Sequence, residues 1–148
     1  MARMDLSEFA SEFGLLLERK HLGRDPEEYD GLLPKELSHR KLHDIEEKFL
    51  VIILQQLFET TTDSSLLWAL GKAPKGLVFE WYLNKVLPNI AELPKDAMWQ
   101  TLIAIENFAD EGITHKEAKV VRQYVQPLKT RPKYKELAMR ILNTIEHS

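Results

Sequence analysis

The chain has 148 residues, of which 44% are hydrophobic and 29% are charged, and its formal net charge is −3. This length suits one domain over residues 1–148, and the hydrophobic content argues against a disordered chain. The absence of cysteine excludes disulfides, thiolate metal sites and a cysteine nucleophile, and it fits a reducing compartment. The longest apolar run, residues 49–54, is too short to span a membrane. We therefore expect a cytoplasmic protein that does not bind membranes.

Helical periodicity begins near the N-terminus. Residues 5–8 have the D-x-x-E form of a capping box. The apolar residues after it recur at helical spacing: Leu6, Phe9, Phe13, Leu16 and Leu17. Gly23 is expected to end this helix in the left-handed conformation. Residues 22–33 combine Gly and Pro with four acidic side chains, which predicts an acidic loop or a short helical turn.

A long central helix is expected from Pro34 to about Glu59, because proline is well suited to the first helical turn. Its apolar residues recur at helical spacing: Leu37, Leu42, Ile45, Phe49, Ile52, Ile53 and Leu57. The run over residues 49–54 would be apolar on every side of such a helix. We therefore predict that Ile52 and Ile53 lie in the core.

The second half of the chain repeats helix-start signals at nearly equal spacing. The segment Thr61–Ser64 supplies side-chain oxygens that can cap a short helix through Leu70. The later signals are Pro74, Pro94, Thr114 and Pro132. The first of them precedes a helix expected over residues 76–90, whose inward residues are Phe79, Leu83, Val86, Leu87 and Ile90. Two such units have a length close to the roughly 40–47 residues of a HEAT or armadillo helix pair. The sequence therefore predicts an all-α fold of six or seven helices, in antiparallel pairs packed as an irregular bundle or a short HEAT-like stack.

Charge is distributed unevenly along the chain. Residues 1–63 carry 8 Lys and Arg against 14 Asp and Glu, a net charge of −6. Residues 113–148 carry 8 against 3, a net charge of +5, and their pattern predicts a basic C-terminal helical hairpin. Such an acidic body favours a basic protein as the partner.

His39 and His43 are the candidate metal ligands, because residues four apart share one face of a helix. Glu36 completes an E-x-x-H sequence of the kind found in di-iron bundles, but no second copy of that sequence occurs. A zinc protease would need H-E-x-x-H, and Arg40 stands in the place of the glutamate. We therefore expect no metal and no other cofactor.

Catalytic motifs are also missing from the sequence. No serine lies in a G-x-S-x-G elbow, and the six glycines are scattered singly rather than grouped in a phosphate-binding loop. The sequence therefore predicts a protein that is not an enzyme.

The segment Lys129–Lys135 is the candidate for nucleic-acid binding, because its four cations surround Tyr134. However, Tyr134 begins an inward apolar stripe, and the chain has a pI of about 6.0. A solvated loop is the preferred interpretation of this segment.

Two tryptophans suggest a binding surface. Trp81 lies beside Lys85, away from the apolar stripe of its own helix. Trp99 begins a second stripe on the next helix, which continues with Ile103, Glu106 and Asp110. An apolar anchor beside charged residues is typical of a protein-binding surface, although both tryptophans could equally complete the core between helices.

Together these patterns predict a non-catalytic module that binds another protein. Among such modules we favour a small stoichiometric inhibitor, such as a bacterial toxin-immunity protein that neutralises a basic nuclease. The same composition also fits an adaptor or assembly factor built on a HEAT-like scaffold. A helical domain that binds nucleic acid through Lys129–Lys135 is the third interpretation.

Overall fold

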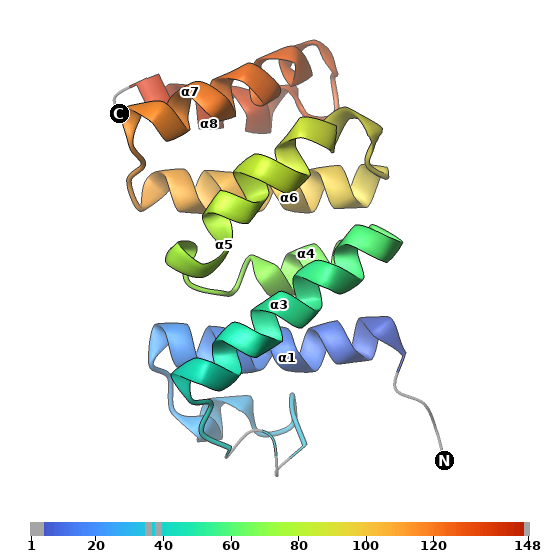
Figure 1. The fold of residues 1–148 in the computed structure, drawn as a ribbon, viewed down its shortest axis with the longest axis vertical. Coiled ribbons are helices and arrows are strands. Elements are labelled where there is room, and N and C mark those ends of the chain that lie inside the picture. The colour runs from blue at the N-terminus through green and yellow to red at the C-terminus, as the bar shows by residue number, and fades with distance from the viewer. Residues whose placement is uncertain (1–4, 35–36, 38–39, 147–148) are drawn as a thin grey trace. The chain divides into compact units, whose positions relative to one another are not determined.

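The computed structural model describes residues 5–34, 37 and 40–146, which form helices joined by short loops (Figure 1). Seven α-helices lie within this part of the chain, together with short 3-10 and π-helical turns. The same residues contain no β-strand, only an isolated bridge between Asp30 and Leu33. The predicted all-α fold is therefore confirmed, while the choice between a bundle and a repeat stack stays a prediction.

The chain divides into two compact units, residues 1–78 and residues 79–148. Each unit buries its own set of apolar side chains, and the helix α5 (Lys75–Trp81) spans the boundary. The expectation of one domain stays a prediction, because compact units of this kind can fold together or separately.

The first unit begins with α1 (Leu6–Leu22), whose ends follow the local sequence signals. Asp5 accepts a hydrogen bond from the Glu8 N–H at 2.8 Å, and Gly23 ends the helix with a φ of 64°. Of the predicted acidic segment, Leu22 still belongs to α1, and the residues after it form the short 3-10 helix η1 (Pro26–Tyr29) and a turn. Tyr29 and Leu33 pack against Leu16 of α1, so this acidic segment covers part of α1 with apolar side chains.

The central helix, α3 (Asp44–Thr61), is shorter than predicted. It begins after His43, whose N–H donates to Glu46 Oε1 at 3.1 Å. Residues 40–43 are not helical, so the prediction of one helix from Pro34 is wrong over that stretch. Residues 35, 36, 38 and 39 lie outside the described part of the chain. The next helix, α4 (Ser64–Leu70), begins at the predicted cap and packs against both α1 and α3.

The prediction that Ile52 and Ile53 lie in the core is wrong, because each is 46% exposed. The buried residues of α3 are Glu47, Leu50, Val51, Leu54 and Phe58. At 100° per residue, these lie on the side of the helix opposite to Ile52. The physical reason is that α1 and α4 cover only one side of α3, so the apolar run has a covered side and an uncovered one.

In the second unit, the helix predicted over residues 76–90 changes its hydrogen bonding along its length. α5 passes into a π-helical turn, η2 (Tyr82–Val86), and then into a 3-10 helix, η3 (Leu87–Glu92). Pro88 lacks an N–H, and its ring would crowd the carbonyl four residues earlier, so regular α-helix cannot continue there. The residues predicted to be inward are buried nevertheless, and Val78 and Tyr82, which were not predicted to be inward, are buried with them. The predicted residues are Phe79, Leu83, Val86, Leu87 and Ile90.

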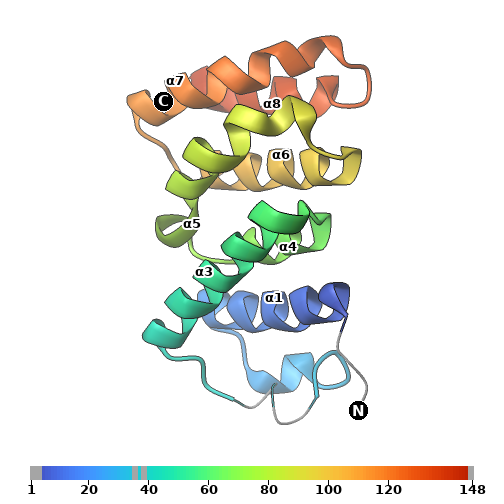
Figure 2. The same ribbon diagram turned by 45° about the vertical axis from the view of Figure 1, so that its right-hand side comes forward.

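The rest of this unit consists of α6 (Lys95–Asp110), α7 (His115–Val125), the 3-10 helix η4 (Gln126–Thr130) and α8 (Lys135–Glu146). Both α6 and α7 pack against α8, and α7 and α8 lie side by side in Figures 1 and 2. Thr114 caps α7 as predicted, since its hydroxyl accepts from the Glu117 N–H at 3.1 Å. No described helix is long and apolar enough to cross a membrane.

Candidate functional site

Four large apolar side chains are exposed on one side of α3. Ile45 is 64% exposed, Phe49 60%, and Ile52 and Ile53 46% each. The opposite, buried side of the same helix instead holds a carboxylate, that of Glu47. We call these four residues the α3 surface. A contiguous apolar patch of this kind on a folded protein is typical of an interaction site.

A pocket of about 220 Å³ adjoins the α3 surface. Phe9, Phe13 and Leu16 of α1 line one part of it, and Leu42, Phe49, Leu50 and Ile53 line another. Its remaining lining residues, Arg40 and Glu46, form an ion pair with each other. Because Phe49 and Ile53 belong to both features, the pocket extends the α3 surface toward α1. We call it the α1–α3 pocket.

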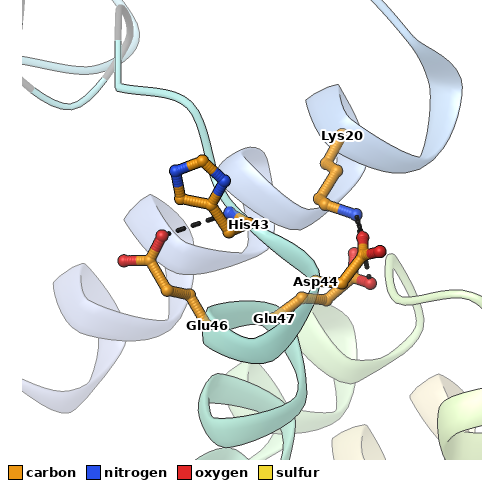
Figure 3. A network of polar contacts seen from close by, with 5 residues as sticks. All are labelled: Lys20, His43, Asp44, Glu46 and Glu47. Atoms are coloured by element: carbon orange, nitrogen blue, oxygen red, sulfur yellow. Dashed lines mark hydrogen bonds and ion pairs between the residues drawn. The ribbon is translucent and has the colours of Figure 1, made fainter.

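A network of polar contacts holds the beginning of α3 against the end of α1 (Figure 3). The Lys20 ammonium donates to Asp44 Oδ1 at 2.6 Å and to Glu47 Oε1 at 3.5 Å. The hydrogen bond and the charge of Asp44 raise the pKa of Lys20, and the same hydrogen bond lowers the pKa of Asp44. The buried Arg19 donates to the carbonyls of Leu37 and Arg40, which fixes the segment before α3.

The charged residues near the α1–α3 pocket belong to this network, and their contacts hold α3 in position. The pKa of Glu46 is lowered because its carboxylate accepts the His43 backbone N–H at the helix start. Asp44 and Glu47 share one lysine, so both carboxylates serve to position α3. The arrangement therefore orients the α3 surface.

The candidate metal ligands are only partly described. His39 lies outside the described residues, and His43 is exposed at the N-cap of α3. Among the residues that the structure does describe, no group of three or more His, Cys, Asp or Glu side chains is placed to hold a metal ion. The expectation of no metal and no cofactor stays a prediction.

The predicted surface around Trp99 lies on α6, next to the beginning of α8. Trp99 is 37% exposed, and its ring lies 6.1 Å from that of the buried Tyr134. Glu106 is already engaged, since Arg140 of α8 donates to it through Nε at 2.8 Å and through Nη2 at 3.2 Å. Ile103 is half-buried and Asp110 is exposed. Part of this stripe therefore packs against α8.

The other predicted pair, Trp81 and Lys85, lies where α5 passes into the π-helical turn. Trp81 is half-buried with its ring 5.2 Å from that of Tyr82, and Lys85 is exposed. Both this pair and the α6 stripe belong to the second unit. Their role in binding stays a prediction.

The nucleic-acid hypothesis for Lys129–Lys135 required an accessible Tyr134. This tyrosine is 4% exposed, and its hydroxyl donates to the Lys95 carbonyl at 3.2 Å. Its ring is therefore unable to stack on a base, as the inward stripe of the last helix predicted.

The α3 surface was not predicted from the sequence, because the apolar run over residues 49–54 was expected to be covered on every side, with Ile52 and Ile53 in the core. The sequence does contain a signal for it: two apolar stripes lie on opposite sides of one helix, and one of them includes Glu47. Each apolar side of such a helix is shielded from water only when another segment or another molecule packs against it.

Comparisons with protein-family models, with curated proteins and with solved structures found no match to the chain.

Proposed function

We propose that this chain is a non-catalytic module that binds another protein through the α3 surface and the α1–α3 pocket. The observation that carries the proposal is the exposed row of Ile45, Phe49, Ile52 and Ile53, continuous with an apolar pocket. Large apolar and aromatic side chains that can be fully desolvated supply most of the free energy of protein association. The pocket would accept one apolar side chain of the partner.

The charge of the chain supports a basic partner. Residues 1–63, which contain α1 and α3, have a net charge of −6. Acidic charge around an apolar contact accelerates the association of a basic protein and disfavours acidic competitors. Within this class the proposed role is that of a stoichiometric inhibitor, such as an immunity protein that neutralises a basic toxin in the cytoplasm.

Site-specific photo-crosslinking tests the proposal. A photoreactive residue at Ile52 of the full chain is expected to capture a basic protein in the native cell, while the same residue at exposed Glu27 does not. The captured protein is then purified, and its affinity, stoichiometry and activity are measured with the unmodified chain.

Two matched variants then locate the contact. Ile52→Asp places a charge on the α3 surface and is expected to weaken binding at least tenfold, about 1.4 kcal/mol. Ser11→Asp adds the same charge at an exposed position of α1 that does not line the pocket, and should change binding less than threefold. Equal affinities for the two folded variants, or a complex that is not one to one, would contradict the proposal.

A further inference from the structure

A second surface, which carries positive charge, is formed by residues of α7, η4 and α8. An open hollow of about 570 Å³ is lined by Lys119, Arg122, Gln123, Gln126 and Pro127. A smaller hollow of about 180 Å³ shares Arg122 and Gln126 with the first and reaches Lys129 of η4. Its other lining residues come from α8: Met139, Leu142, Asn143 and Glu146. We call the two together the α7–α8 groove.

The three cations of this groove, Lys119, Arg122 and Lys129, form no ion pair with the described residues. Arg122 is half-buried, yet its guanidinium makes no hydrogen bond or ion pair there. Arg24, Arg40 and Arg140, by contrast, each pair with a glutamate. Lys119 and Lys129 also lack a partner among these residues, and Glu146 is the one acid in the lining. Three cations that form no ion pair give this area a positive charge, with which an anionic group of another molecule can pair.

Apolar and amide groups accompany these cations. Met139 is 44% exposed and Leu142 is half-buried, so both offer apolar contact at the edge of the charged area. Gln123 and Gln126 can each donate to and accept from a peptide backbone. This combination of charge, apolar contact and amide groups matches an acidic peptide with apolar side chains.

A nucleic acid fits the groove less well. None of the residues that line it is aromatic, so bases would have no ring on which to stack. The second unit as a whole carries 10 Lys and Arg against 9 Asp and Glu, a net charge of +1. Nucleic-acid-binding domains are usually strongly basic.

We propose that the α7–α8 groove binds an acidic, partly apolar peptide segment of a partner protein, with Arg122 as the central anion contact. This site involves other residues than the α3 surface, so each proposal can fail without the other. A chain that used both surfaces would connect a basic protein to an acidic one, as an adaptor does.

Fluorescence anisotropy with labelled probes tests the groove. The full chain is titrated into a 16-residue peptide of Glu and Leu at helical spacing, an all-Glu peptide of the same length, a Lys and Leu peptide, and a 20-base-pair DNA duplex. The Glu and Leu peptide is expected to bind most tightly, and its affinity should fall as NaCl rises from 50 to 300 mM. Undetectable binding of this peptide, or equal or tighter binding of the duplex or the all-Glu peptide, would overturn the proposal.

Charge-reversal variants assign the binding to the groove. Arg122→Glu is expected to lower the affinity for the Glu and Leu peptide at least tenfold, and the double variant Lys119→Glu/Lys129→Glu should do the same. Lys95→Glu makes the same charge change at an exposed position outside the groove and should alter the affinity less than threefold. Circular dichroism confirms the fold of each variant. Equal affinities of the Lys95 and Arg122 variants would show that the peptide responds only to net charge.

Discussion

Gly14 is a residue at which α1 approaches α4 closely. A Cβ atom built on Gly14 would lie 2.6 Å from Cζ3 of Trp68 and 3.1 Å from the Cα of Ala69. Both distances are shorter than ordinary van der Waals contact, and Ala69 belongs to the backbone of the neighbouring helix. The absence of a side chain at Gly14 therefore sets the spacing of the two helices.

We expect Gly14→Ala to destabilise the protein by about 1–2 kcal/mol, because overpacking outweighs the better helix propensity of alanine. Gly76→Ala is the matched control, since a Cβ there would meet nothing within 4 Å. That variant should be neutral or more stable by up to about 1 kcal/mol. Urea denaturation measures both free energies, and a Gly14→Ala variant as stable as the wild type would show that the helices can separate at little cost.

Asp44 makes a pH-dependent contribution to stability. Its hydrogen bond with Lys20 lowers the pKa of Asp44 below its ordinary value of 3.8. The unfolded chain therefore takes up this proton at a higher pH than the folded chain does. The stabilisation is complete above pH 3.8 and is lost as the pH falls through the lower pKa of the folded state.

Asp44→Asn should consequently show a smaller loss of stability on acidification than the wild type. The measurement is the urea midpoint at pH 6 and at pH 3. Glu27→Gln, which removes an exposed carboxylate of the same unit, serves as the control and should follow the wild type. Identical changes in midpoint for Asp44→Asn and wild type would mean that the Lys20–Asp44 contact does not stabilise the fold.

At the scale of the element, α3 is a helix with two apolar sides, of which only one is covered. Leu54 is completely buried, while its neighbour Ile53 is 46% exposed. Because adjacent residues of a helix point about 100° apart, substituting each in turn separates the two sides.

We expect Leu54→Ala to cost about 2–5 kcal/mol, as for other fully buried leucines, and Ile53→Ala about 1 kcal/mol or less. Ile53→Asp should still fold, since its side chain reaches solvent. Thermal and urea unfolding measure these differences. If Leu54→Ala and Ile53→Ala lowered the free energy of unfolding equally, the α3 surface would be covered in solution.

At the scale of the whole molecule, the open question is whether residues 1–78 and 79–148 unfold together. A domain of this length usually unfolds in one cooperative step. Trp68 lies in the first unit and Trp99 in the second, so variants that retain only one of these tryptophans report on each unit separately.

If the chain is a single domain, the Trp68 and Trp99 signals should give the same urea midpoint. Leu54→Ala should then lower the two midpoints equally. The retained-Trp68 protein carries Trp81→Phe and Trp99→Phe, and the retained-Trp99 protein carries Trp68→Phe and Trp81→Phe. If Leu54→Ala shifted only the Trp68 signal, the two units would be independent domains and the prediction of one domain would be wrong.

Local signals in the sequence determined where most helices begin and end. Asp5, Gly23, Asp63 and Thr114 each act at a predicted boundary. A cap depends on residues within one turn of it, so neighbours along the chain are sufficient to predict it. The same holds for the inward stripes of α6 and α8, whose apolar residues repeat with the helical period.

Contacts between segments that are distant along the chain decided which helix faces are buried and which charged residues remain unpaired. The apolar run of α3 indicates a helix, but the packing of α1 and α4 determines which side is covered and which becomes the α3 surface. Glu106 was predicted to contact a partner, yet Arg140 on another helix already pairs with it. Arg122, by contrast, is left without such a partner among the described residues. Periodicity determines the faces of each helix, whereas which face remains available for binding depends on neighbours that only folding brings together.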